Sequence, residues 1–211
     1  MAIGDLGATD IFSLGAGFNA QSSSTNNARD IVEVLGATGD IACLTPFNTV
    51  VTASAEYEVC GSQTLSISLG DVVGGYIVNS VELSHSAGSA PTVSIEGIAF
   101  DGGETVNSNA YAISQAVNIA SVSGLMGVAS TEATEISYRW ECEVTQSMGS
   151  DGQVSYAVSR TPKLTYTESG IGTLSSAPSI TDYTLESYEN SDSNQETDTY
   201  TATFVKELVS A

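Results

Sequence analysis

The sequence is poor in positive charge and has no long apolar run. Its 211 residues carry 25 aspartates and glutamates against five lysines and arginines, a formal net charge of −20. So acidic a chain repels duplex DNA and anionic membranes, which argues against a surface that binds nucleic acid. A surface past which nucleic acid slides without binding remains possible. No segment is apolar for long enough to span a membrane, and no basic residue precedes Arg29, so no membrane span or secretion signal is predicted. We therefore expect the chain to be made and folded in a cytoplasm.

Cysteine is also scarce. The three cysteines, Cys43, Cys60 and Cys142, are an odd number and contain no CxxC pair. This pattern predicts neither a disulfide framework nor a zinc site. We expect small buried side chains within strands, and Cys43 and Cys60 could lie on neighbouring strands.

The only histidine, His85, lies between two serines, Ser84 and Ser86. Neighbouring side chains on a strand point to opposite faces, and no aspartate is placed to orient the ring, so a catalytic serine–histidine pair is not predicted. Two Asp-Gly segments, 101–104 and 151–152, resemble calcium loops but lack alternating oxygen ligands. Phosphate-binding and nucleophile-elbow motifs are missing. No catalytic, cofactor-binding or metal-binding residue is assigned, and the chain is predicted not to be an enzyme.

Carboxylates occur in pairs, as in the active sites of glycoside hydrolases, so a glycosidase is kept as an alternative. A spacing of two residues places Glu56 with Glu58, and Glu141 with Glu143, on one face of a strand. We interpret these pairs as parts of a solvated acidic face. The other acidic groups are Asp182, Glu186 and Glu189, followed by Asp192, Glu196 and Asp198.

Alternation of apolar and polar residues is the main pattern that is present. The stretch 76–100 reads as two strands around a turn rich in serine, glycine and proline, and 183–208 repeats this pattern. Strands are also expected at 49–60 and 63–69. A helical period is nearly missing, and a short helix fits only within 107–117. These features predict an all-β sandwich or barrel with little helix, with Trp140 in its core.

Two parts of the sequence resemble each other. Ser80 and Glu82 recur as Ser187 and Glu189, at an offset of 187 − 80 = 107. The pattern E-x-E-V recurs at an offset of 143 − 58 = 85, which predicts an insertion of 107 − 85 = 22 residues in the second copy. The first 28 residues are small and polar, and we expect an arm that orders on a neighbour or remains disordered. The predicted organisation is an N-terminal arm (1–28), a first β copy (29–100), a linker (101–115) and a second β copy (116–211) with a long hairpin arm within 145–181.

This order of strands and polar loops resembles the tail tube proteins of tailed bacteriophages. The matching text is YIVNSV at 76–81 with SHS at 84–86, and YTLESY at 183–188 with NSDS at 190–193. The resemblance implies β-sandwich or barrel subunits that form rings, which stack into a hollow tube. A duplicated member is expected to form trimers with pseudo-sixfold symmetry.

The resemblance also implies the partners and the location. The expected partners are further copies of the chain and other tail or neck proteins, with DNA passing through without specific binding. The expected location is the tail of the virion, after assembly in the host cytoplasm, with no membrane and no cofactor. A terminator, hub or neck ring is a related possibility. The alternative from another class is a β-sandwich binding module, such as a capsid decoration protein or an adhesin.

Overall fold

The computed structural model describes residues 9–35, 41–100, 105–106, 110–149, 154–192 and 197–208. Every regular element in these ranges is a β-strand, so the predicted all-β class is confirmed. The segment considered for a short helix contains β8 (Tyr111–Val117) instead. Within the described residues, no helix is long and apolar enough to cross a membrane.

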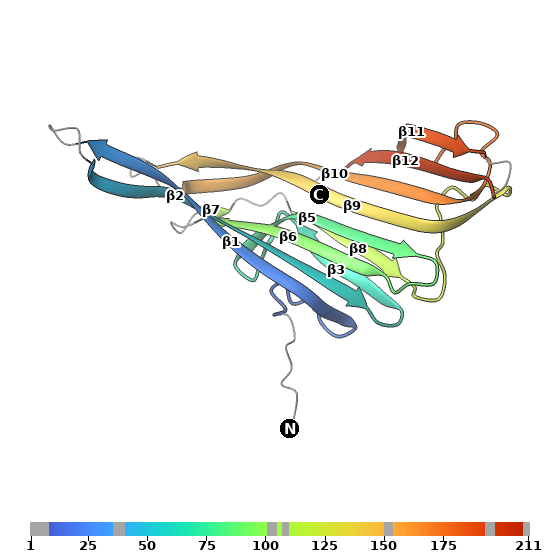
Figure 1. The fold of residues 1–211 in the computed structure, drawn as a ribbon, viewed down its shortest axis with the longest axis horizontal. Helices are drawn as coiled ribbons and strands as arrows, with labels where there is room; N and C mark the ends of the chain where they lie inside the picture. Colours follow the sequence, from blue (N-terminus) through green and yellow to red (C-terminus); the bar gives the residue numbers. More distant parts are fainter. Residues whose placement is uncertain are drawn as a thin grey trace, which may run out of the picture.

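One large, mainly antiparallel sheet forms the body of the molecule (Figure 1). Its strand order is β1-β2-β6-β5-β9-β10-β12-β11, with β4 (Val72–Val73) paired to β5 and β7 (Thr105–Val106) paired to β10. A second sheet consists of β3 (Gln63–Leu69) and β8. The strands of the large sheet are β1 (Phe18–Leu35), β2 (Ile41–Val59), β5 (Tyr76–Ser86), β6 (Thr92–Phe100), β9 (Thr131–Met148), β10 (Val154–Gly172), β11 (Thr184–Ser191) and β12 (Thr199–Glu207).

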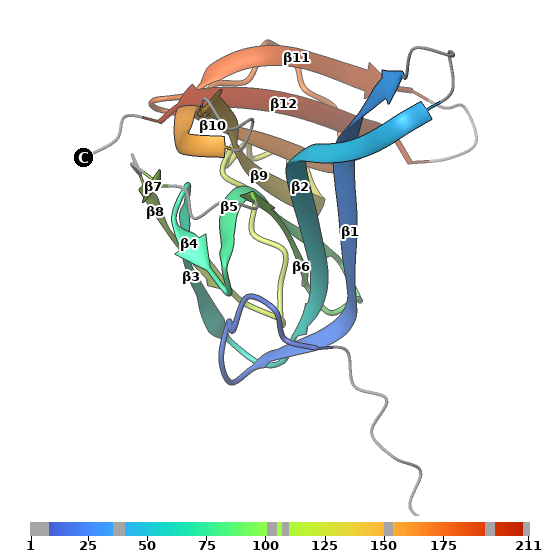
Figure 2. The ribbon, with the colours of Figure 1, turned by 90° about the vertical axis from the view of Figure 1, so that its left-hand side faces the viewer.

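The core lies on one face of the large sheet, where β3 and β8 cover part of it (Figure 2). Alternate residues of each strand point into this core, as the sequence pattern predicts. On β2 the buried residues are Ala53, Ala55, Tyr57 and Val59. Trp140 is also buried there, as expected, and stacks on Tyr138 with a centroid distance of 5.6 Å.

The large sheet contains the same four-strand order twice, because β1-β2-β6-β5 is followed by β9-β10-β12-β11. The long hairpin of each half has the same limits at one offset: β1 and β9 start at 18 and 131, and 131 − 18 = 113. The second strands, β2 and β10, end at 59 and 172, and 172 − 59 = 113. Figure 1 shows that the far ends of both long hairpins extend in the same direction beyond the rest of the sheet.

Irregularities of strand pairing also recur at these offsets. The register shift at Ala20/Ser22 in β1 has its counterpart at Ala133/Glu135 in β9. In the short hairpins, the shift at Val78/Ser80 in β5 corresponds to that at Leu185/Ser187 in β11, with 185 − 78 = 107. A β-bulge changes the local bend of a strand, so matching bulges give the two halves matching shapes.

The prediction of an N-terminal arm is wrong for residues 9–28, the part of it that the structure describes. Residues 18–28 belong to β1 and pair along β2. Residues 9–17 pack on the same chain: Phe12 is buried, and its backbone N–H donates to the Tyr57 hydroxyl at 3.2 Å. That hydroxyl donates to Asp10 Oδ1 at 2.8 Å. The boundary predicted at residue 28 therefore falls inside a strand, and residues 1–8 lie outside the described residues.

The predicted insertion also differs from the observed pairing. The recurrence of E-x-E-V at 56–59 and 141–144 would equate β2 with β9, but β2 is the second strand of its hairpin and β9 is the first. By position in the sheet, β9 corresponds to β1 and β10 to β2. The segment 145–181 thus contains the far end of β9 and all of β10, and the first half has a hairpin of equal length. The linker 101–115 likewise contains the start of β8.

Candidate assembly surface

The large sheet has one face that points away from the core and is rich in hydroxyl and charged groups. Alternation along each strand places serine, threonine and glutamate on this face. Hydroxyl pairs link neighbouring strands, with Ser24 Oγ 2.8 Å from Ser54 Oγ and Ser169 Oγ 3.0 Å from Thr201 Oγ1. The outward residues include Thr52, Ser54 and Glu56 of β2, Thr92, Ser94 and Glu96 of β6, and Thr165, Thr167 and Ser169 of β10.

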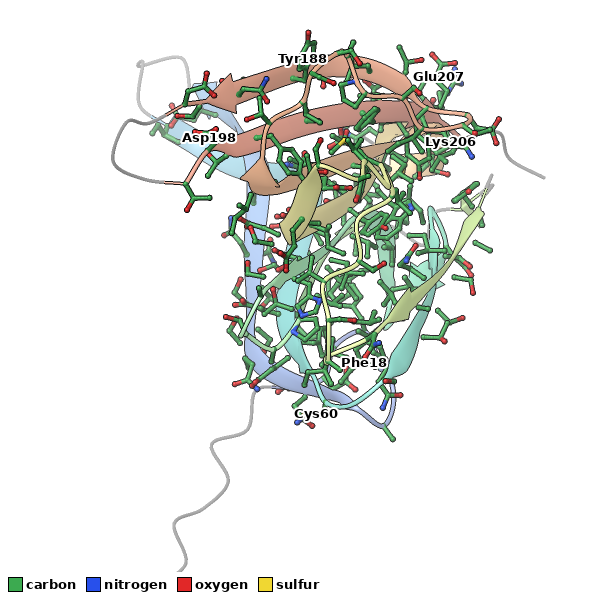
Figure 3. The ribbon with its side chains drawn as sticks, turned by 90° about the vertical axis from the view of Figure 1, so that its right-hand side faces the viewer. Phe18, Cys60, Tyr188, Asp198, Lys206 and Glu207 are labelled. Carbon is green, nitrogen blue, oxygen red and sulfur yellow. The ribbon has the colours of Figure 1, made fainter. Side chains whose placement is uncertain are left out.

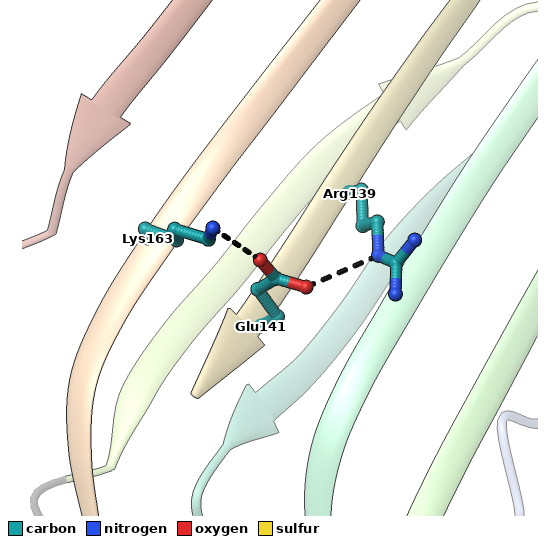
Figure 4. A network of polar contacts seen from close by, with 3 residues as sticks. All are labelled: Arg139, Glu141 and Lys163. Carbon is teal, nitrogen blue, oxygen red and sulfur yellow. Dashed lines mark ion pairs between the residues drawn. The ribbon is translucent and has the colours of Figure 1, made fainter. Parts of the chain in front are cut away.

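An ion-pair network crosses this outward face near the middle of the sheet (Figure 4). Glu141 accepts from Arg139 Nε at 3.2 Å and from Lys163 Nζ at 2.6 Å. The hydrogen bond and the negative charge of Glu141 raise the pKa of Lys163. A groove of about 380 Å³ surrounds the network and is also lined by Glu96 and Glu143. A single carboxylate thus bridges two of the five basic residues of the chain, and two further carboxylates line the same groove.

The two outer strands of the large sheet, β1 and β11, end the strand order on opposite sides. In the described part of the chain, no strand pairs with the outer edge of either. Figure 3 places Phe18, the first residue of β1, at one end of the molecule and Tyr188 of β11 at the other. Tyr188 is 44% exposed, and residues 24–29 of β1 are all exposed. Such edges present unpaired N–H and C=O groups that can add a further strand.

His85 points into the core side of β5, opposite Ile136 of β9. Burial lowers its pKa, and a hydrogen bond with the Ser89 backbone opposes this effect. The cavity beside it has a volume of about 210 Å³ and is lined by Gln115, Asn118 and Ser121 among others, with no carboxylate among its described residues. This surrounding suits a neutral packed imidazole.

The sequence reading missed a buried carboxylate, Glu168 of β10, which is 2% exposed. Its Oε2 accepts from the Tyr166 hydroxyl at 2.6 Å and from the Leu125 backbone N–H at 2.9 Å. Its Oε1 accepts from the Tyr200 hydroxyl at 2.9 Å. Burial and the bond to Glu168 raise the pKa of Tyr200 to about 12. The alternation along β10 would have indicated that Glu168 faces inward, because it shares a face with Leu164 and Tyr166.

The carboxylate pairs singled out in the sequence lie on outer surfaces. Glu56 and Glu143 are exposed, and Glu58 and Glu141 are half-buried. Within the described ranges, no three histidine, cysteine or acidic residues gather as a metal site. The segments 101–104 and 151–152 and the side chain of Glu196 lie outside the described residues. Asp192 is exposed, Asp182 lies 4.0 Å from Lys206, and Asp198 accepts from Thr173 at 3.3 Å.

The cysteines do not share one environment. Cys43 lies near the start of β2 and Cys60 directly after its end, so the two are separated by the length of that strand, on the order of 50 Å. Cys60 is exposed, so the prediction that its side chain is buried is wrong. Cys142 is half-buried, and burial raises its pKa to about 11. Cys43 and Cys60 are therefore not neighbours on adjacent strands.

The fold and this surface define the chain as an all-β protein with two open sheet edges in its described part. Comparison with models of known protein families found no match, and no curated protein matched the sequence.

Proposed function

We propose that the chain is a structural subunit of a virus particle, the tail tube subunit of a tailed bacteriophage. In this proposal, copies of the chain form rings, and the rings stack around a channel for DNA. A trimer with pseudo-sixfold symmetry is the proposed ring, because each chain would contribute two similar four-strand units. The protein would reside in the virion tail after assembly in the host cytoplasm, in contact with other tail or neck proteins.

One observation carries the proposal: the two halves of the sheet have the same strand order and are joined edge to edge through β5 and β9. If each half is one of the six units of a ring, the same kind of junction would be needed between chains. The outer edges of β1 and β11 are where such junctions would form. Pairing with a neighbour satisfies backbone groups that a separate chain leaves to water.

The outward face of the large sheet supports the channel part of the proposal. It carries hydroxyl groups and carboxylates such as Glu56 and Glu96, and the whole chain has a net charge of −20. Phosphates near an acidic wall are repelled, so DNA would pass without binding. We propose that this face lines the channel.

Electron microscopy of the purified, concentrated protein tests the proposal. Rings or stacked tubes with a central channel are the expected result. Uniformly dispersed monomers, at every concentration and salt condition tried, would contradict it and would favour the alternative of a binding module such as a decoration protein or an adhesin.

A further inference from the structure

We infer that β11 of one chain pairs with β1 of a second copy, in the register in which β5 meets β9 inside the chain. This inference rests on the proposed function, since it names the strands through which neighbouring copies would join. The partner is a second copy of this chain, and the two copies join head to tail.

The junction inside the chain supplies the register. β5 and β9 are antiparallel, with Ser80 opposite Glu141 and Glu82 opposite Arg139. The counterpart of each β5 residue lies 107 positions later in β11, since 187 − 80 = 107. The counterpart of each β9 residue lies 113 positions earlier in β1, since 141 − 28 = 113. Transfer of the internal register predicts the pairs Ser187–Ala28, Tyr188–Asn27, Glu189–Asn26, Asn190–Thr25 and Ser191–Ser24 between chains.

The shape of β1 suits this pairing. Residues 22–28 form a regular section between two register shifts, as do their counterparts 135–141 in β9. The bulges do not prevent a further strand from adding, because β9 has bulges at the same places and pairs on both sides. Neither β1 nor β11 contains proline or lysine, two residues that commonly protect exposed sheet edges from pairing.

The side chains differ between the internal junction and the proposed one. On the core side, the internal junction places Val81 opposite Trp140, which are both buried. The corresponding pair between chains is Tyr188 with Asn27, which are both exposed in the separate chain. A polar edge lets the separate chain stay in solution, and the junction would depend mainly on backbone hydrogen bonds. The proposed contact is therefore reversible, whereas the internal one is part of the core.

Head-to-tail pairing follows from the direction of the repeat. β11 is the counterpart of β5, and β1 is the counterpart of β9, which pairs with β5 inside the chain. The β11 edge of one chain therefore fits the β1 edge of the next chain. A contact between two different surfaces of identical chains generates a closed ring, or an open filament if the rotation does not close. Pairing of like edges, β1 with β1 or β11 with β11, would instead stop at a dimer.

Disulfide trapping tests the register. The variant combines Asn27→Cys with Tyr188→Cys in a chain in which Cys60→Ser removes the exposed thiol. Under mild oxidation we expect covalent species larger than a dimer, because each chain can link to two neighbours. The matched control combines Ser23→Cys with Tyr188→Cys. Ser23 lies on the same side of β1 four residues away, about 14 Å along the strand, which exceeds the reach of a disulfide of about 7 Å between Cα atoms.

A charge exchange provides a second test in folded protein. Asn26 is exposed and is predicted to lie opposite Glu189 of the neighbour. Asn26→Glu should raise the concentration needed for assembly, and adding Glu189→Arg to the same chain should restore it. The control Asn26→Gln should assemble like the original chain.

The outcomes separate this inference from the proposed function. If the protein assembles but neither trapping nor charge exchange follows the predicted pairs, the register is wrong while the assembly stands. In the chain with Cys60→Ser, cross-linking to dimers by Asn27→Cys alone or by Tyr188→Cys alone would show like-to-like pairing and overturn the head-to-tail arrangement. A protein that is monomeric under all conditions would overturn both.

Discussion

Glu168 is the residue whose environment is most demanding, because it is a buried carboxylate whose two oxygens accept four hydrogen bonds. Two tyrosine hydroxyls and the backbone N–H groups of Leu125 and Met126 point at its oxygens. These bonds tie the segment between β8 and β9 to β10. A buried carboxyl group is stabilised by the hydrogen bonds that it accepts, and loss of the acceptor leaves the donors unsatisfied.

Replacing this carboxylate should therefore destabilise the fold strongly. We expect Glu168→Leu to lower the free energy of unfolding by about 2–4 kcal/mol, and Glu168→Gln to lower it by less. Urea denaturation followed by tryptophan fluorescence measures the change through Trp140. The matched control is Glu56→Gln on the outward face, for which we expect a change within about 0.5 kcal/mol. Equal effects at both positions would contradict the role of Glu168 in the core.

His85 gives a prediction about pH. Burial lowers its pKa below the ordinary value of 6.5, so the folded state favours the neutral ring. The stability that the neutral ring contributes is present above pH 6.5 and is lost as the pH falls through the lowered pKa, because the unfolded chain then binds the proton more readily. His85→Gln should make the loss of stability between pH 7 and pH 5 smaller. Denaturation curves of both proteins across this range measure the difference, and parallel pH profiles would contradict it.

At the scale of elements, the N-terminal segment completes the core of the first half. In the second half, Phe204 is buried at the position that Gly97 occupies in the first, since 204 − 97 = 107. The Phe12 ring fills the space beside Gly97: a Cβ added there would lie 3.0 Å from that ring and 2.8 Å from Tyr76 Cβ. Residues 9–17 are therefore part of the fold.

This packing predicts a coupled effect of two substitutions. Gly97→Ala should lower the free energy of unfolding by about 1–3 kcal/mol, because the added methyl group must displace both Tyr76 and the Phe12 ring. Phe12→Leu alone should also destabilise, since a buried ring is lost. The double variant should be less destabilised than the sum of the two, because the smaller side chain leaves room for the methyl group. Strict additivity in a denaturant cycle would show that the two residues do not share this space.

Several elements could be predicted from the sequence because their strands alternate clearly. β3, β5, β6 and β12 fall within the predicted stretches. The alternating residues 30–35 predict the end of β1, but its first part was missed, because the segment QSSSTNN at 21–27 has no apolar alternation and its strand conformation depends on backbone pairing with β2. The match of E-x-E-V at 56–59 with 141–144 was wrong, because strands with the same residue pattern cannot be told apart without knowing which strands they pair with. Likewise, Glu168 could not be recognised as the anchor of the segment 118–130, since the backbone donors of that segment, Leu125 and Met126, are more than 40 residues away in sequence.

At the scale of the whole molecule, charge should control assembly. Each chain carries a net charge of −20, so neighbouring copies repel one another at low ionic strength. Salt screens this repulsion, with a Debye length of about 30 Å at 0.01 M and about 10 Å at 0.1 M. We expect the assembled fraction to rise as sodium chloride is raised between these concentrations, measured by sedimentation velocity at constant protein concentration. Dissociation on adding salt would instead indicate a contact held by ion pairs.

The most direct test of head-to-tail assembly is the native mass of the purified protein over a range of concentrations. The account predicts a trimer of 3 × 21.7 = 65.1 kDa, or multiples of it, in equilibrium with the single chain. A mass of 21.7 kDa at every concentration, up to the highest that stays in solution, would contradict the account.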